Sequence, residues 1–432
     1  GRALSAVLML SAPVLTVMGG SVPTASATPL SCSVGYVSNT FSDSVSLIDP
    51  ATATVLTTVS VGAGPLDIAF SPSGDYVYVL NHNGDNMSVI ATSSNTVVDT
   101  IGAGASPRGI ALTPDGTMAY VADQGDNTVS VINLTSGITE ASVDVGLQPW
   151  AVVAAVDGSK VYVSQSSGSA IDVIDTATNT VTTSIVTSPG GISGPRGMTL
   201  SNDGALLYVV NGSDDSVSVI DTSTDTVIGD PIDTGSIPTD VVVSPDGGSL
   251  YVTELFGNTV SKIDLATGTR TSVGTFNGAY GIAMAPEQEI LFASASSDSK
   301  VAAINTAPFE FSSWLDVGSY PSVVRFSPGC TPTIAGVSPS SGSLSGGETL
   351  TITGYDFGAH PIVTVGGQRC TSLVVVSAAE LTCVVPAGVV GAADVVVQNY
   401  HSLPYTRVGG YTYVDRTPLP PTGATSTPIV LM

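Results

Sequence analysis

Basic residues are scarce in this sequence, which has three lysines, eight arginines and three histidines among 432 residues. Asp and Glu together number 35, so the formal net charge is −24 at pH 7. Nucleic acids and anionic membrane surfaces are bound by clustered Lys and Arg, so this balance excludes both as partners of the mature protein, apart from any membrane anchor. The acidity favours solubility of an exported protein, and it is compatible with Ca²⁺ binding without implying it.

Residues that commonly carry catalysis are equally scarce. Of the histidines, only His82 falls within the repeated part of the chain described below; His360 and His401 follow it. A multi-histidine metal site or a histidine acid–base pair therefore cannot be assembled there. The sequence also lacks a G-x-S-x-G elbow and a C-x-x-C-H motif. We predict no catalytic residue, metal or cofactor, and we favour a non-enzymatic role, although carboxylates that the fold brings together would leave enzyme chemistry open.

The four cysteines are placed as two separate pairs. Cys32 precedes the repeats and Cys330 follows them, so closure of the repeats into a ring would bring the two together. Cys370 and Cys383 lie 13 residues apart further along the chain. We predict two disulfides and an oxidising, extracellular location.

One sequence unit recurs along most of the chain. In Ser106–Asn133 it reads as three short strands, with a tight turn at Pro114-Asp115-Gly116. Copies of its first half begin 42, 42, 46, 43, 41 and 42 residues apart. They begin at Pro65, Pro107, Pro149, Pro195, Pro238, Ala279 and Pro321. A period near 42 with about four short strands is typical of β-propeller blades.

The second half of the unit, as in Asn127–Asn133, also occurs seven times, but its series is offset from the first. The array begins with a second half at Tyr36–Asp49 and finishes with a first half at Pro321–Ser327. The two ends must share one blade if no strand edge is to stay open. We predict an all-β fold in which residues 28–330 form a seven-bladed propeller.

The repeat resembles the YVTN family of propeller repeats, through its Ser-Pro-Asp-Gly turn, Tyr-Val pair and Val-Ser-Val-Ile-Asp run. That family occurs in surface-layer and exported proteins. The resemblance spans Tyr36 to about Ser327 and implies the fold, whereas propellers host lyases, lactonases and binding platforms alike.

Residues 331–413 differ in character from the repeats. The run PTIAGVSPSSGSLSGGETLTITGYDFG, followed by VTVGGQRC and AAELTCVVP, resembles an IPT/TIG domain. Gly346-Gly347 and Gly366-Gly367 are hairpin signals. We predict an immunoglobulin-like β-sandwich after the propeller, and a Pro/Thr-rich linker over residues 414–432.

The two ends of the chain resemble targeting signals. Ala3–Met18 is apolar and is followed by Ala25-Ser26-Ala27, so residues 1–27 resemble a signal peptide with a truncated start; a membrane anchor is the alternative, but the apolar run is short for a span.

The segment LPPTG near the other end matches the LPxTG sorting signal, in which sortase cleaves after Thr and joins it to the cell wall. We expect a truncated tail here, and a chance match in a Pro/Thr-rich linker is the alternative. The matching residues are Leu419, Pro420, Thr422 and Gly423.

The residue directly after the first residue of each first-half copy predicts a candidate binding site. We call that first residue the blade-opening residue. Corresponding positions on the inner strands of a propeller encircle one mouth of its channel, and here they include two Arg, a Trp and a Tyr, which are common binding anchors. The seven are Leu66, Arg108, Trp150, Arg196, Thr239, Tyr280 and Ser322. We predict a site formed by Arg108, Trp150, Arg196, Asp240 and Tyr280. The alternative is that these side chains fill the channel and the arginines pair with Asp67 and Asp240.

Aspartates that recur in the repeat are interpreted as turn residues, because Asp side chains bond nearby backbone N–H groups. They include Asp67, Asp115, Asp203 and Asp246. The Asp/Asn-rich loops are likewise interpreted as hairpin turns, since none follows a calcium ligand pattern.

These observations together predict an exported bacterial surface protein, anchored to the cell wall by sortase. Its propeller would bind an unidentified ligand, glycan or protein on an Ig-like module. An exported lyase or lactonase that uses a divalent cation, and a structural surface-layer component, are the alternatives.

Overall fold

The computed structural model describes residues 33–185, 194–286, 289–329, 331–358, 361–399, 402 and 404–415. The expected signal peptide, the Cys32–Cys330 pair, the LPPTG motif, His360 and His401 lie outside these residues. Among the described residues, the single helix is the short 3-10 helix η1 (Ser296–Asp298), and no helix is long and apolar enough to cross a membrane.

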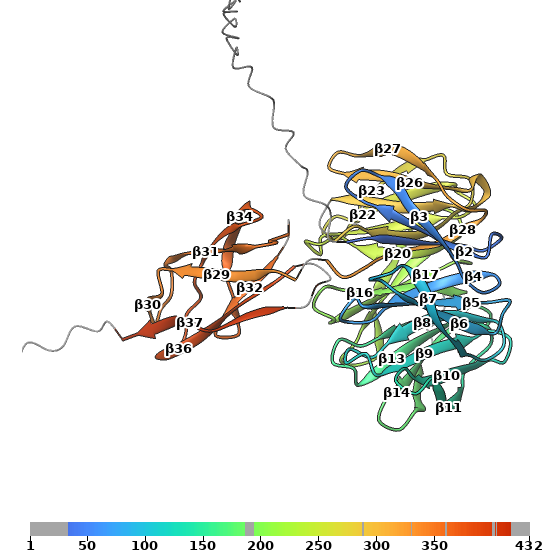
Figure 1. The fold of residues 1–432 in the computed structure, drawn as a ribbon, viewed down its shortest axis with the longest axis horizontal. Helices are drawn as coiled ribbons and strands as arrows, with labels where there is room; N and C mark the ends of the chain where they lie inside the picture. Colours follow the sequence, from blue (N-terminus) through green and yellow to red (C-terminus); the bar gives the residue numbers. More distant parts are fainter. Residues whose placement is uncertain are drawn as a thin grey trace, which may run out of the picture. The chain divides into compact units, whose positions relative to one another are not determined.

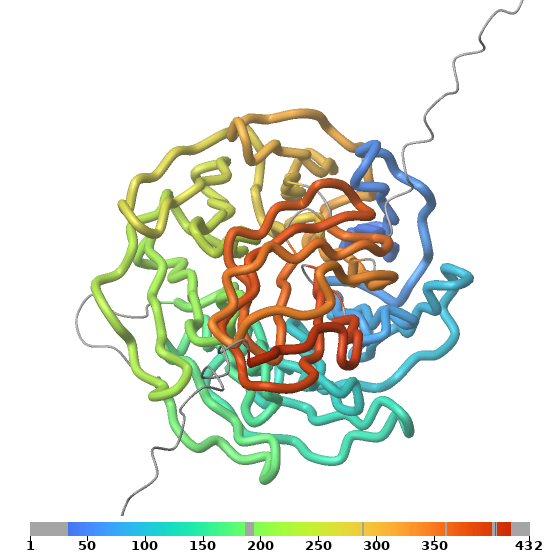
Figure 2. Tube along the Cα trace, turned by 90° about the vertical axis from the view of Figure 1, so that its left-hand side faces the viewer, coloured from blue at the N-terminus to red at the C-terminus, as the bar shows by residue number. Residues whose placement is uncertain are grey.

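Seven four-stranded antiparallel sheets follow one another around a ring in the order of the sequence, from blue to orange in Figures 1 and 2. We number these blades from the one that holds the N-terminal strand and give their strands from the channel outward. Blade 1 contains β28 (Pro321–Phe326), β1 (Gly35–Asn39), β2 (Ser44–Asp49) and β3 (Thr54–Ser60). Blade 2 contains β4 (Pro65–Phe70), β5 (Tyr76–Asn81), β6 (Asn86–Ala91) and β7 (Thr96–Gly102). Blade 3 contains β8 (Pro107–Leu112), β9 (Met118–Asp123), β10 (Thr128–Asn133) and β11 (Ile138–Asp144).

The remaining four blades repeat this order. Blade 4 contains β12 (Pro149–Ala154), β13 (Lys160–Gln165), β14 (Ala170–Asp175) and β15 (Thr180–Ile185). Blade 5 contains β16 (Pro195–Leu200), β17 (Leu206–Asn211), β18 (Ser216–Asp221) and β19 (Thr226–Asp233). Blade 6 contains β20 (Pro238–Val243), β21 (Ser249–Glu254), β22 (Thr259–Asp264) and β23 (Arg270–Gly274). Blade 7 contains β24 (Ala279–Met284), β25 (Ile290–Ala295), β26 (Lys300–Thr306) and β27 (Phe309–Asp316).

Blade 1 closes the ring by joining the two ends of the repeat array. β28 pairs antiparallel with β1, with Phe326 opposite Gly35 and Val324 opposite Val37. The Ser327 backbone N–H also donates to the Val34 carbonyl over 2.9 Å. The predicted seven-bladed fold with a shared closing blade is therefore confirmed.

The propeller core lies between neighbouring blades, because each sheet buries both faces of its middle strands. Tyr78 and Leu80 of β5, for example, pack in one apolar cluster with Ile110 of β8 and Val121 of β9. The outermost strands are mostly exposed. In β3 and β7, for example, only the residue before the last one is buried.

Asp and Asn side chains tie consecutive blades together. In five blades the residue before the third strand adopts a positive φ between 47° and 59°, which Asn and Asp tolerate better than most residues. Its side-chain oxygen accepts a hydrogen bond from a backbone N–H that precedes the next inner strand, over 2.6 to 2.9 Å. These residues are Asp43, Asp85, Asn127, Asp215 and Asn258.

Residues 333–414 form a β-sandwich of two sheets around a separate apolar core. Cys370 and Cys383 form the predicted disulfide inside this core. One sheet contains β29 (Thr333–Ser338), β31 (Thr349–Tyr355), β35 (Glu380–Val384) and β34 (Thr371–Ser377). The other contains β30 (Ser341–Ser343), β37 (Tyr405–Val414), β36 (Gly391–Gln398), β32 (Ile362–Val365) and β33 (Gln368–Arg369).

Candidate functional site in the propeller channel

The seven inner strands enclose a cavity of about 380 Å³ along the propeller axis. Leu66, Arg108 and Tyr280, from the position after the blade-opening residue, line one end. Phe70, Met284 and Phe326, which end their inner strands, line the opposite end. This volume falls within the range of small-molecule sites.

A β-bulge at the start of every inner strand sets which side chains face the cavity. Pairing with the second strand shifts register within the first residues of the strand, as between Pro65 and Ile68 in β4. The same shift occurs in the other six inner strands. Bulges redirect side chains, so both residues after the opening position, such as Leu66 and Asp67, line the channel.

Four of the five predicted site residues come together at the end of the cavity. Arg108 reaches across the channel from blade 3 and donates a hydrogen bond from Nη2 to the hydroxyl of Tyr280 in blade 7. The Arg108 guanidinium carbon lies 3.2 Å from the ring centroid of Trp150, and that of Arg196 lies 5.1 Å from the same centroid. The Trp150 and Tyr280 ring centroids are 6.4 Å apart. We call Arg108, Trp150, Arg196 and Tyr280 the arginine–aromatic cluster.

Thr239 and Ser322 occupy corresponding positions but have structural contacts. Thr239 is buried, and its hydroxyl donates to the Tyr280 carbonyl over 2.7 Å. The buried Ser322 hydroxyl lies 2.7 Å from that of Thr40.

The two guanidiniums of the cluster have no carboxylate partner among the described residues, whose ion pairs involve other basic side chains. Arg108 Nε is buried without a hydrogen-bond partner in this part of the chain. Burial lowers the pKa of Arg108 and the charge of Arg196 lowers it further, whereas Tyr280 and Asp67 raise it. Burial likewise lowers the pKa of Arg196 and raises that of Tyr280. The cluster is thus a half-buried, positively charged end of the channel.

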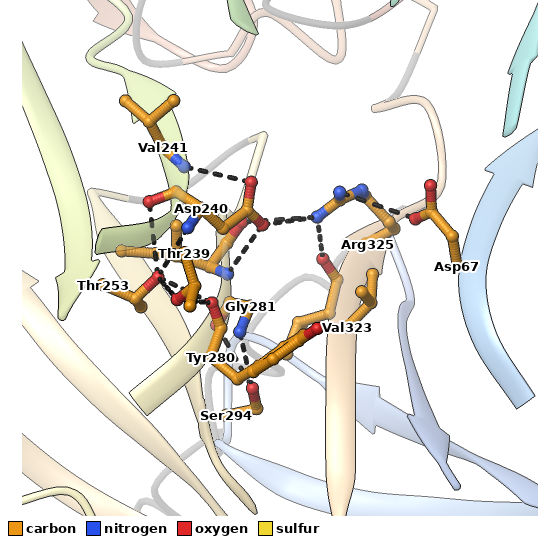
Figure 3. Close-up of polar contacts among 12 residues, drawn as sticks. Asp67, Thr239, Asp240, Val241, Thr253, Tyr280, Gly281, Ser294, Val323 and Arg325 are labelled. Carbon is orange, nitrogen blue, oxygen red and sulfur yellow. Dashed lines mark hydrogen bonds and ion pairs between the residues drawn. The ribbon is translucent and has the colours of Figure 1, made fainter. Parts of the chain in front are cut away.

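Arg325 lies between the carboxylates of Asp67 and Asp240 (Figure 3). Its Nη1 lies 3.2 Å from Asp240 Oδ2, and its Nη2 lies 3.5 Å from Asp67 Oδ1. Although burial opposes the charged form, Asp240 and Asp67 raise the pKa of Arg325. Burial raises the pKa of Asp67, and Arg325 counteracts this rise. We call these three residues the channel triad.

The contacts of the channel triad show that two interpretations made from the sequence are wrong. Asp67 lies on inner strand β4 and not in a turn, since the bulge directs it into the channel. The pairing of the cluster arginines with Asp67 and Asp240, which was part of the alternative interpretation, is also wrong, because Arg325 forms the ion pairs with both carboxylates. Asp240, predicted as part of the binding site, therefore belongs to the triad.

Each triad carboxylate also joins two adjacent inner strands. Asp67 accepts from its neighbour Ile68 N–H over 2.9 Å and from Ile110 N–H of blade 3 over 3.2 Å. Asp240 accepts from Val241 N–H over 3.0 Å and from Ile282 N–H of blade 7 over 3.2 Å. These backbone contacts hold the carboxylates in place.

Arg325 is the channel residue that the sequence-based prediction lacks. It occupies the fifth position of its inner strand, where the other six blades have Ala, Val or Thr. An arginine at a position where the other blades have smaller side chains was the feature of the sequence that could have identified this channel residue. The corresponding residues are Ala69, Ala111, Val153, Thr199, Val242 and Ala283.

The channel does not fit the divalent cation that the enzyme alternative requires. Two carboxylates face the cavity, but the Arg325 guanidinium lies between them and bonds to both. Within the described ranges, no group of three or more His, Cys, Asp or Glu is placed to hold a metal ion.

Two family models match separate parts of the chain. Residues 332–413 match the IPT/TIG domain, as predicted. Residues 100–231 match the model described as lactonase, 7-bladed beta-propeller. Among curated proteins, mouse fibrocystin-L is 46% identical over 65 residues and human fibrocystin-L is 41% identical over 66 residues. Each match covers 15% of this chain, which spans only 2% of the length of those relatives.

Solved structures share the propeller fold. Hydrazine synthase of Kuenenia stuttgartiensis has a TM-score of 0.55 at 24% identity, over 60% of this chain and 88% of that chain. A functionally unknown protein of Desulfotomaculum acetoxidans has a TM-score of 0.58 at 17% identity, and a candidate 6-phosphogluconolactonase of Bacteroides fragilis has 0.56 at 18%. Both of the latter matches cover 68% of this chain and 98% of the other. The chain therefore combines a seven-bladed propeller, part of which matches the lactonase propeller model, with an immunoglobulin-like sandwich that matches the IPT/TIG domain.

Proposed function

We propose that this chain is a cell-surface binding protein whose propeller takes an anionic ligand at the arginine–aromatic cluster. The observation that carries the proposal is that Arg108 and Arg196 approach one indole without a carboxylate partner among the described residues. A half-buried guanidinium without a carboxylate partner is unfavourable, and a bound carboxylate or phosphate would compensate its charge.

Display at the cell surface is the second part of the proposal. It rests on the apolar segment Ala3–Met18, on the LPPTG motif and on the resemblance of the repeats to the YVTN family. Sortase would join Thr422 to the cell wall. The IPT/TIG domain would then separate the propeller from its attachment point, since such sandwich domains commonly act as spacers or contact modules.

Calorimetric titration of the purified chain tests binding. The probes are oligogalacturonate and polyglycerol phosphate, with a neutral cello-oligosaccharide as the control ligand. We expect saturable binding of an acidic probe and at least a tenfold loss of affinity in the double variant Arg108→Met/Arg196→Met. Arg369→Met, which removes an exposed arginine of β33 in the sandwich, is the control protein and should bind as the wild type does. Equal affinity in the double variant and the wild type would refute the proposed site.

A lactonase is the second candidate, favoured by the family match over residues 100–231. Its chemistry would have to use Asp67 or Asp240, the carboxylates that face the cavity. Turnover of a sugar lactone by the wild type that is abolished in Asp240→Asn would favour this candidate over simple binding.

A further inference from the structure

One end of the channel cavity is apolar, and the other end carries hydrogen-bond donors. Phe70, Met284 and Phe326 line the first, and Arg108 and Tyr280 of the arginine–aromatic cluster line the second. The channel triad also lines the cavity, with Arg325 of blade 1 bridging Asp67 of blade 2 and Asp240 of blade 6. A ligand that fills this space must therefore combine a polar group with an apolar body.

The formal charges near the cavity favour a ligand that carries a single negative charge. Among the residues that line the cavity, Arg108 and Arg325 balance the charges of Asp67 and Asp240. Arg196, which does not line the cavity but lies 5.1 Å from the ring centroid of Trp150, adds one positive charge, so one positive charge is in excess. A monoanion neutralises this excess, whereas a dianion such as phosphate leaves a net negative charge. Charge imbalance is unfavourable in a partly buried cavity.

Two hydrogen-bond donors at the cluster end are unused. Arg108 Nε is buried and has no partner among the described residues. The Tyr280 hydroxyl accepts from Arg108 Nη2, so its own hydrogen is available to a further acceptor. Burial raises the pKa of Tyr280, which keeps this hydroxyl protonated at neutral pH.

We propose that the cavity binds a small organic monocarboxylate, with its carboxylate at Arg108 and Tyr280 and its apolar body toward Phe70 and Phe326. This inference deepens the proposed function and rests on it, because it names the class of anion that the cluster takes. It adds that the body of the ligand enters the channel rather than lying on the outer face of the propeller.

Calorimetry of the full chain with matched small ligands tests the inference. Benzoate is compared with acetate, which lacks the apolar body, with benzamide, which lacks the charge, and with phenyl phosphate, which carries a second charge. We expect benzoate to bind at least tenfold more tightly than each of the other three. Arg108→Met should abolish benzoate binding, and the sandwich variant Arg369→Met should not change it.

One variant tests the charge argument separately. Asp240→Asn leaves an excess of two positive charges, so it should shift the preference from benzoate toward phenyl phosphate by about tenfold. Thermal unfolding of each variant, followed by circular dichroism, identifies variants that fail to fold, and the ligand comparison in the wild type does not depend on any of them.

The outcomes separate the two proposals. Benzoate affinity equal to that of acetate or benzamide would overturn the cavity inference. If the acidic oligomers still bound through Arg108 and Arg196 in that case, the proposed function would stand alone. Failure of every anion to bind would overturn both.

Discussion

Arg325 pairs with two carboxylates that would otherwise repel each other in the channel. Its side chain is 33% exposed, and those of Asp67 and Asp240 are 15% and 13% exposed. At such burial, removal of one charged partner leaves the others without compensation. The triad therefore contributes to propeller stability independently of any ligand.

We predict that Arg325→Met lowers the free energy of unfolding of the propeller by about 3 kcal/mol. Asp67 and Asp240 would then be left partly buried without their counter-ion. Urea unfolding followed by tryptophan fluorescence measures the change, and Arg369→Met is the control. A loss below about 0.5 kcal/mol, the usual effect of a surface substitution, would contradict the structural role of the triad.

A second residue-scale prediction concerns Asp123 at the end of β9. Its side chain is fully buried and accepts from Gly104 N–H over 3.0 Å and from Ser130 Oγ over 2.6 Å. Burial raises its pKa from 3.8 to about 6. Because the folded-state pKa is the higher one, this group's contribution to stability is fully present below pH 3.8 and is lost as the pH rises through about 6.

Asp123→Asn should therefore stabilise the propeller at pH 8, by up to about 3 kcal/mol, and flatten the decline between pH 4 and pH 7. Asparagine already occupies this position in three blades, where its Nδ2 donates to serine hydroxyls, as Asn81 does to Ser88 over 2.9 Å. Urea midpoints at pH 4, 6 and 8 give the comparison. An unchanged pH profile would show that Asp123 does not cause the decline.

At the scale of elements, the inner strands determine the channel. The repeat register correctly predicted that Arg108, Trp150, Arg196 and Tyr280 meet, because corresponding positions of a propeller lie on one ring. It did not predict that Arg108 crosses the channel or that Asp67 faces inward. Those features depend on side-chain reach and on the bulge of each inner strand, and neither follows from the period of the sequence.

The inner strands also approach each other closely. A Cβ added at Gly109 of β8 would lie 2.5 Å from the Trp150 carbonyl oxygen of β12. We predict that Gly109→Ala destabilises the propeller by about 2 kcal/mol and weakens anion binding, because β12 carries Trp150. Gly102→Ala on the outer strand β7, where an added Cβ has nothing within 4 Å, is the control. Urea unfolding and calorimetry of both variants check this, and equal effects at the two sites would contradict it.

At the scale of the whole molecule, the propeller and the sandwich have separate apolar cores. The Cys370–Cys383 disulfide lies in the sandwich core and closes a loop of 13 residues. The double variant Cys370→Ser/Cys383→Ser should lower sandwich stability by about 3 kcal/mol. The propeller transition and anion affinity should not change. Differential scanning calorimetry with parallel titration measures both, and a shift of both transitions would contradict independent cores.

The central claim is that the propeller channel binds a carboxylate through the arginine–aromatic cluster, and anomalous diffraction tests it most directly. Crystals of the full chain soaked with 4-bromobenzoate report the position of the bromine atom. We predict an anomalous peak inside the cavity near Phe70 and Phe326, with the carboxylate in contact with Arg108, and no channel peak in crystals of Arg108→Met. Bromine peaks confined to the outer surface, with an empty channel, would contradict the claim.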